Sequence, residues 1–169
     1  MYKLFQDKVP FAQSNENRFK DNELRRLDRL IKKQIKEKFS SELNLYIVDS
    51  ASCSACELEL QTLFNPLYNI SKNGVKVVYE IEKADILIIT GLVSENMYKE
   101  ILDLYEQLKE PKRVILFGDC PLFKAPFQDT FAIKRPLEFE FSSAYNISGC
   151  PPEPKRILNE LLHYLKEYI

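Results

Sequence analysis

The stretch ADILIITG, residues 84–91, is a mostly apolar run that ends at a glycine. A strand with one solvated face alternates polar and apolar residues, whereas a strand buried on both faces is a near-continuous apolar run. This stretch therefore predicts a strand in the interior of a parallel sheet. Strands of the same kind are predicted at residues 43–49 (LNLYIVD) and 111–118 (PKRVILFG), with shorter ones at 76–80 (KVVYE) and 145–149 (YNISG).

Segments with helical spacing separate these strands, and alternation of strand and helix is typical of a parallel sheet covered on both faces. We therefore predict a doubly wound, flavodoxin-like α/β fold, with a mostly parallel sheet, flanking helices, and an N-terminal arm and helix. The predicted organisation is an arm and basic amphipathic helix over 1–40, followed by one α/β domain over 41–169. Helices are predicted at residues 19–39, 56–68, 94–109 and 151–169, and 119–144 is predicted to be mostly irregular.

The composition excludes several classes of function. With 169 residues, 45% hydrophobic and 29% charged, the chain is typical of one soluble domain. A formal net charge of −1 gives no reason to expect nucleic acid as a partner. No apolar run is long enough for a transmembrane segment, and the first twenty residues have no apolar core of a secretory signal. We expect a reduced, cytoplasmic setting, which disfavours disulfides.

The four cysteines all follow predicted strand ends. Cys53 and Cys56 follow the strand at 43–49, while Cys120 and Cys150 follow the fourth and fifth strands. Carboxyl ends of parallel strands share one edge, where open α/β sheets bind ligands. The C-x-x-C pair alone is compatible with a metal ion, an iron–sulfur cluster, a redox disulfide or small buried side chains. A four-thiolate site suits zinc or a 4Fe–4S cluster, and the residues favour the cluster because two ligands stand alone in a domain that already has a core.

Four motifs occur in a familiar order. CSACE (53–57), ADILIITGLVSENM (84–97), PKRVILFGDC (111–120) and GCPPEPKRILNELL (149–162) together resemble the small electron-transfer subunit of nickel–iron hydrogenases. They are also similar to the homologous 20-kDa subunit of respiratory complex I. In the complex I subunit the first two cysteines are adjacent, so the C-x-x-C spacing resembles the hydrogenase side. The resemblance covers about residues 43–165.

The resemblance implies the short form found in membrane-bound energy-converting hydrogenases and formate hydrogenlyase complexes (group 4). Cys53, Cys56, Cys120 and Cys150 would hold one proximal 4Fe–4S cluster, which relays electrons between the nickel–iron site of a large subunit and a ferredoxin-like iron–sulfur subunit. Complex I-like membrane subunits would complete the assembly, with this chain cytoplasmic and peripheral on the inner face of the cell membrane. No catalytic centre is expected on this chain itself. Glu57 would act in proton transfer or at an interface, or else its charge would simply suit the N-terminus of a helix.

Two other functions stay open. One is the equivalent cluster-bearing subunit of a complex I-like quinone or ferredoxin oxidoreductase, because the active metal would belong to another chain. The other is a zinc-stabilised binding module. The basic residues of the 19–39 helix suggest a solvated face or docking near the membrane; they are Arg25, Arg26, Arg29, Lys32, Lys33, Lys36 and Lys38.

The chain departs from the family pattern at two positions beside the ligands. Ala55 stands where the family usually has glycine, and an alanine restricts positive φ. Asp119 stands where a small residue precedes the third cysteine. Close to a cluster, its charge would lower the reduction potential; otherwise it would be a solvated loop carboxylate. The glycine-rich loop that often follows is replaced by PLFKAPFQDTF, residues 121–131.

Overall fold

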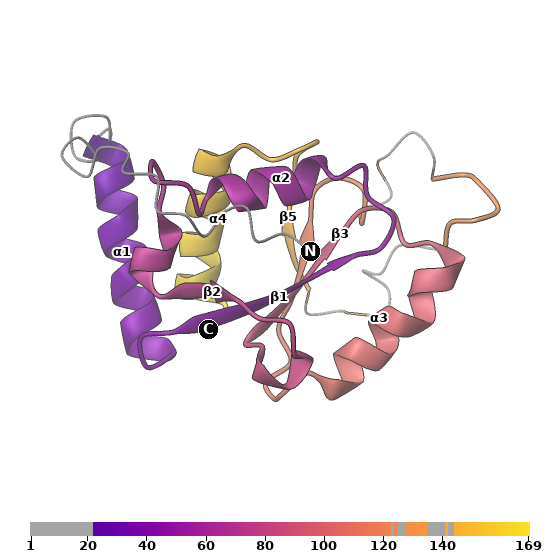
Figure 1. Ribbon diagram of the computed structural model, residues 1–169, viewed down its shortest axis with the longest axis horizontal. Helices are drawn as coiled ribbons and strands as arrows, with labels where there is room; N and C mark the ends of the chain where they lie inside the picture. Colours follow the sequence, from indigo (N-terminus) through magenta and orange to yellow (C-terminus); the bar gives the residue numbers. More distant parts are fainter. Residues whose placement is uncertain (1–21, 123, 125–127, 135–140, 142–143) are drawn as a thin grey trace, which may run out of the picture.

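The structure is a computed structural model, and it describes residues 22–122, 124, 128–134, 141 and 144–169. The predicted arm, residues 1–17, lies outside these residues, as does part of the stretch 119–144. The described elements, shown in Figure 1, are α1 (Asn22–Lys38), β1 (Leu43–Asp49), α2 (Ala55–Thr62), the 3₁₀ turn η1 (Ile70–Asn73), β2 (Val75–Val77), the 3₁₀ turn η2 (Ile81–Lys83), β3 (Ile86–Thr90), α3 (Glu95–Gln107), β4 (Val114–Phe117), β5 (Tyr145–Ile147) and α4 (Pro154–Glu167).

The strands form one sheet in the order β2-β1-β3-β4-β5, and each pair of neighbours is parallel. The central strand β3 is the stretch from which the prediction began, and all of its residues are buried. Its neighbours on both sides and the layers above and below it explain why its sequence is continuously apolar. This strand order is that of flavodoxin-like folds. The predicted α/β fold is therefore confirmed.

Successive side chains along each strand point to opposite faces of the sheet, where they join different cores. Ile86 and Ile88 of β3 belong to the core that includes residues of α1, α2 and α4, whereas Leu87 and Ile89 belong to the core with α3. Figure 1 shows α3 on the other side of the strands from α1 and α4. Helices thus cover both faces of the sheet. The carboxyl ends of its strands stay uncovered by these helices, and the loops that follow them lie there.

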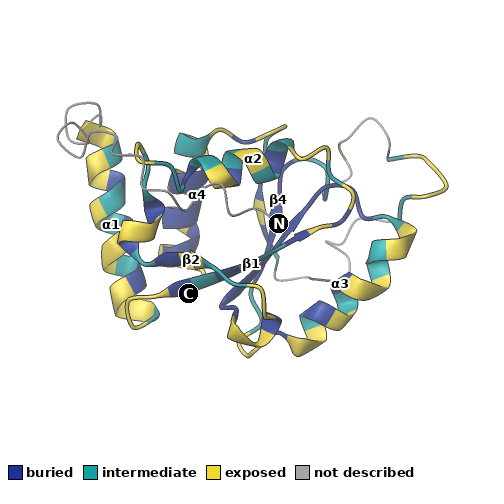
Figure 2. Cartoon of the chain, viewed as in Figure 1, coloured by how far each residue is buried: buried dark blue, intermediate teal, exposed yellow. Residues whose placement is uncertain are grey.

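The helix α1 packs through Leu27, Ile31 and Ile35, which share a core with the sheet. At its end, Lys38 donates a hydrogen bond from Nζ to the carbonyl of Leu165 in the last turn of α4, at 2.5 Å. The ammonium group of Lys38 stabilises the C-terminal end of α4, because the last carbonyls of a helix lack intrahelical partners. Figure 2 shows that the outer side of α1 is mainly exposed. The domain boundary predicted after residue 40 stays a prediction.

Several elements are shorter than predicted, among them β4, which begins at Val114 rather than at residue 111. The helix α2 ends at Thr62, before Pro66, because the residue preceding a proline is disfavoured in the helical conformation. That residue, Asn65, accepts hydrogen bonds through Oδ1 from the backbone N–H groups of Leu67 and Tyr68, at 2.8 and 3.2 Å. The strand β2 ends at Val77 rather than at residue 80, and the turn η2 leads the chain to β3.

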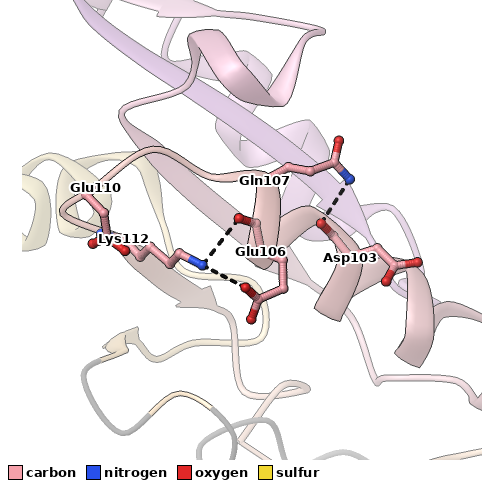
Figure 3. A network of polar contacts seen from close by, with 5 residues as sticks. All are labelled: Asp103, Glu106, Gln107, Glu110 and Lys112. Carbon is pink, nitrogen blue, oxygen red and sulfur yellow. Dashed lines mark hydrogen bonds and ion pairs between the residues drawn. The ribbon is translucent and has the colours of Figure 1, made fainter.

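Local contacts fix both ends of α3. At its start, Ser94 accepts a hydrogen bond through Oγ from the N–H of Met97, at 3.3 Å, as the predicted cap requires. At its end, Lys112 donates from Nζ to the carbonyl and to the carboxylate of Glu106, at 3.3 and 3.1 Å (Figure 3). Within the described ranges, none of the helices combines the length and the apolar character that a membrane crossing requires.

Candidate metal centre at the carboxyl edge of the sheet

The loop that follows β1 carries the first two cysteines. Asp49, the last residue of β1, accepts hydrogen bonds through Oδ1 from the backbone N–H groups of Ala51 and Ser52, at 3.0 and 2.7 Å. This turn is one that aspartate favours, because its short side chain can bond to the backbone ahead of it. As a result Cys53 lies exposed in the loop, and Cys56 lies buried in the first turn of α2.

The same loop is fastened to the end of β3. Ser50 is fully buried, and its Oγ donates a hydrogen bond shared between the carbonyls of Thr90 and Leu92, at 2.6 and 3.1 Å. Gly91 has a φ of +81°, and a Cβ on it would lie 2.5 Å from the backbone nitrogen of Ser52. Only glycine permits this approach. The position of the cysteine loop is therefore set by the end of the central strand.

The third and fourth cysteines follow β4 and β5, which are neighbours in the sheet. The N–H of Asp119 donates to the carbonyl of Gly149 at 2.9 Å, and the carboxylate of Asp119 accepts from the N–H of Gly149 at 2.8 Å. Asp119 directly precedes Cys120, and Gly149 directly precedes Cys150, so these hydrogen bonds join the loops that follow β4 and β5. Asp119 is half-buried. Its carboxylate therefore has a defined partner that joins two cysteine loops, unlike the solvated carboxylate that the sequence left open.

The three strand ends bring the four thiols within electrostatic reach of one another. Gly118, after β4, has a φ of +91°, and a Cβ on it would lie 2.7 Å from the Sγ of Cys56. Burial first, and then the negative charges of Glu57 and the other three cysteines, raise the pKa of the Cys56 thiol to about 12. Burial and the neighbouring cysteines also raise the pKa of Cys120. Four thiols that disfavour each other's ionisation would be stabilised as thiolates by a bound cation.

The chemistry of this donor set suits a soft metal, either zinc or an iron–sulfur cluster. In the part of the chain that the structure describes, no three His, Cys, Asp or Glu side chains are grouped as ligands of a single metal ion. The thiols come from separate strand ends, and the buried sulfur of Cys56 packs closely against Gly118. Thiolates presented from several directions fit a cuboidal 4Fe–4S cluster, which takes four of them.

Glu57 is held next to Cys56 by two hydroxyl groups and also lines a surface pocket. Its carboxylate accepts hydrogen bonds from the Oγ of Ser52, at 2.8 Å, and from the Oγ1 of Thr90. Its side chain also lines a pocket of about 300 Å³, together with Tyr46 and Tyr79. Glu57 is therefore both a charged neighbour of the cysteines and a residue of the pocket lining. The role expected for it in proton transfer or at an interface stays a prediction.

Ala55 does not restrict the backbone as expected. It is the first residue of α2, and it is absent from the residues with positive φ. The left-handed conformations fall instead on Ser54, with a φ of 66°, and on Ala51, with a φ of 139°. Alanine is the best helix former. An alanine in place of the family's glycine therefore suits the local conformation, and the restriction on positive φ has no effect at this position.

The prediction from chemistry-bearing residues missed the glycines and hydroxyls that shape the site. Gly91, Gly118 and Gly149 have φ values of +81°, +91° and +147°, and each lacks room for a Cβ. The sequence does indicate these three glycines, because each follows the end of a predicted strand, next to or near a cysteine loop. The sequence does not indicate the hydroxyls of Ser52 and Thr90. Both donate to the carboxylate of Glu57, and the contact between Thr90 and Glu57 forms only in the folded chain.

The exposure of the thiols predicts the order in which they react in the metal-free chain. With a pKa of about 12, about one Cys56 thiol in ten thousand is ionised at pH 8, and only the thiolate reacts. Iodoacetamide at pH 8 should therefore modify the exposed Cys53 and Cys150 well before Cys56, as peptide mass spectrometry would measure. In urea all four should react alike. Equal rates for Cys53 and Cys56 in the folded chain would contradict the buried position of Cys56.

The fold and the four thiols define a flavodoxin-like protein with a cysteine site at the edge where open α/β sheets bind ligands. Comparison with known proteins gives the family. The chain belongs to the family described as "NADH ubiquinone oxidoreductase, 20 Kd subunit", whose model matches residues 53–164. The matched segment contains all four cysteines. The predicted family is therefore confirmed.

Relatives occur among both hydrogenases and NADH-quinone oxidoreductases. The chain is 32% identical to "Probable membrane-bound hydrogenase subunit mbhJ" of Pyrococcus furiosus, over 73% of this chain and 74% of the relative. It is 30% identical to "Formate hydrogenlyase subunit 7" of Escherichia coli, over 76% of this chain and 50% of the relative. It is 32% identical to a subunit of the NADH-quinone oxidoreductase of Carboxydothermus hydrogenoformans, over 62% of this chain and 64% of the relative. The prediction of an oxidoreductase subunit is confirmed.

A solved structure supports the fold independently. The chain aligns with a chain in the "Structure of the membrane-bound sulfane sulfur reductase (MBS), an archaeal respiratory membrane complex", with a TM-score of 0.61. The two chains are 22% identical, and the alignment covers 81% of this chain and 75% of the other. At this identity the likeness concerns the fold alone.

Proposed function

We propose that this chain is the electron-relay subunit of a multisubunit nickel–iron hydrogenase of the formate hydrogenlyase-like group 4. In this proposal Cys53, Cys56, Cys120 and Cys150 hold one proximal 4Fe–4S cluster. The observation that supports the proposal is that four cysteines follow three strand ends at one edge of the sheet, where the other three cysteines are close enough to Cys56 to raise the pKa of its thiol. When bound, such a cluster takes up and gives back one electron at a time.

The residues of the chain would hold the cluster and set its surroundings. Cys56 would supply a ligand from the interior, while the exposed Cys53 and Cys150 would close the outer side toward a partner. The carboxylate of Asp119 lies beside two ligand loops, and its charge is one of those that raise the pKa of Cys120. A negative charge in this place would favour the oxidised state and lower the reduction potential.

The proposed partners are a nickel–iron large subunit, a ferredoxin-like iron–sulfur subunit and complex I-like membrane subunits. In this assembly the chain would sit in the cytoplasm, peripheral on the inner face of the cell membrane, and hydrogen chemistry would take place in the large subunit. The hydrogenase relatives and the C-x-x-C spacing of Cys53 and Cys56 support this choice. Leu58, which is 61% exposed on α2 beside the cysteine loop, would suit such a contact.

A second candidate is the equivalent subunit of a complex I-like quinone or ferredoxin oxidoreductase. The relative from the NADH-quinone oxidoreductase of Carboxydothermus hydrogenoformans favours it, at an identity similar to that of the hydrogenase relatives. Purification of the intact complex separates the two proposals. Nickel in a co-purifying large subunit, with hydrogen-dependent dye reduction, would support the hydrogenase, whereas a nickel-free complex that reduces quinone would support the second candidate.

Metal analysis of the anaerobically purified chain tests the cofactor. We expect about four irons and four sulfides per chain, and an electron paramagnetic resonance signal that appears on reduction. One zinc per chain without iron would contradict the relay and favour the zinc-stabilised module. The large apolar core already present in this domain disfavours a structural zinc, since such ions stabilise domains that lack one.

A further inference from the structure

A second pocket lies at the opposite edge of the sheet, where β1 and β2 begin. It has a volume of about 210 Å³, and four lysines from three elements line it. Lys32 and Lys36 come from α1, Lys72 comes from η1, and Lys76 comes from β2. The serines at positions 41 and 71 add hydroxyl groups to the lining. The lining therefore consists mainly of hydrogen-bond donors.

The charge of this pocket is only partly compensated. Glu42 forms an ion pair with Lys76, with 2.5 Å between the carboxylate oxygen and Nζ. In the described part of the chain, Lys32 and Lys36 make no ion pair. The lining holds four lysines and one glutamate, and Lys32 and Lys36 are the two lysines on which the binding proposed below depends, whereas the whole chain has a formal net charge of −1. Positive charge is thus concentrated in one concave site.

The backbone around the pocket is closely fitted. Gly74 has a φ of +95°, and a Cβ on it would lie 2.2 Å from the carbonyl oxygen of Ser41. The neighbouring Asn73 is buried and donates from Nδ2 to the carboxylate of Asp28 on α1, at 3.2 Å. The three elements that carry the lysines are therefore held in a fixed relation. The backbone of such a site needs no rearrangement when it binds an anion, so only the lysine side chains have to be ordered.

We propose that this pocket binds the phosphate group of a phosphate ester. A phosphate offers several acceptor oxygens to the lysines that line the pocket from three elements, and lysine binds phosphate as a point charge. The source is either a lipid headgroup or a small phosphorylated molecule. Arg25, Arg29, Lys32 and Lys36 follow one another at spacings of four, three and four residues, so they form a basic stripe of about 16 Å along α1 that ends in the pocket. The stripe suits a lipid surface beside the phosphate that enters the pocket.

The test compares two variants of the full chain that lose equal charge on the same helix. Lys32→Gln with Lys36→Gln removes charge from the pocket, whereas Arg26→Gln with Lys33→Gln removes it elsewhere on the exposed side of α1. Glutamine is a good helix former, so α1 should persist in both. Binding is measured by calorimetry with inorganic phosphate, and by co-sedimentation with vesicles of phosphatidylcholine alone or mixed with phosphatidylglycerol.

We expect the pocket variant to bind its ligand about tenfold more weakly than the matched variant, because charge-assisted hydrogen bonds are lost. Binding of mixed vesicles that depends on the pocket assigns the phosphate to a lipid headgroup. Pocket-dependent binding of inorganic phosphate alone assigns it to a small molecule. The proposal is overturned if neither probe binds, or if both variants weaken binding equally, since that result indicates diffuse attraction to α1. Circular dichroism and iron content should not change in either variant.

Discussion

Replacement of Cys56 by serine is expected to remove most of the iron from the anaerobically purified protein. Cys56 is the buried one of the four cysteines, and its sulfur lies against the backbone of Gly118. A serine oxygen is a harder and more weakly ionised ligand than a thiolate, and soft thiolate ligands select iron–sulfur clusters. Iron should fall from about four per chain to below about one, with loss of the resonance signal. Chemical analysis of iron and sulfide measures this change.

The control for this substitution is Gln61→Ser, which introduces the same side chain on the exposed side of α2. It should leave the iron content unchanged. If Cys56→Ser also keeps its iron and its signal, then Cys56 is not a ligand, and the assignment of the four-cysteine site is refuted.

Substitution of Gly118 by alanine is expected to cause a comparable loss of iron without removing any ligand. The new Cβ would lie 2.7 Å from the Sγ of Cys56, so the sulfur would have to turn away from its present position. The backbone φ of +91° adds strain, since the left-handed conformation costs about 1–2 kcal/mol for residues other than glycine. The measurements are iron per folded chain and the midpoint of thermal unfolding.

Gly74→Ala provides the matched control at the other edge of the sheet. Its φ is +95°, and its Cβ would lie 2.2 Å from the carbonyl oxygen of Ser41. This variant should also unfold at a lower temperature, but each folded chain should keep its full iron. Equal iron loss in both variants would indicate a general effect of stability. Full iron in Gly118→Ala would contradict the close contact with Cys56.

The fold could be predicted because its main determinant is local. The continuous apolar run that became β3, and the glycines that follow β3 and β4, are visible in the sequence and are required by burial on both faces. The boundaries of β2 and α2 were less accurate. The strand is a short edge strand, and a turn held by Asn65 replaces the predicted last turns of the helix.

The position of the candidate site could be predicted in part. The convergence of the cysteines follows from a topological rule, because carboxyl ends of parallel strands meet at one edge. The partner of Asp119 is Gly149, thirty residues away along the chain, and no local pattern encodes that contact. The reason for Ala55 could not be found in the sequence, because the loop places its positive φ values on Ala51 and Ser54, before the helix begins.

The reciprocal hydrogen bonds between Asp119 and Gly149 have a consequence for the assembly of the site. They form between protein groups, so they close with the fold and without any metal. The loops that carry Cys120 and Cys150 are therefore joined before any metal binds. For the cluster proposed above, part of the ordering that would otherwise accompany metal capture is completed during folding. Uptake of that cluster would then need little rearrangement of the backbone, since the loop after β1 is also fastened to the end of β3.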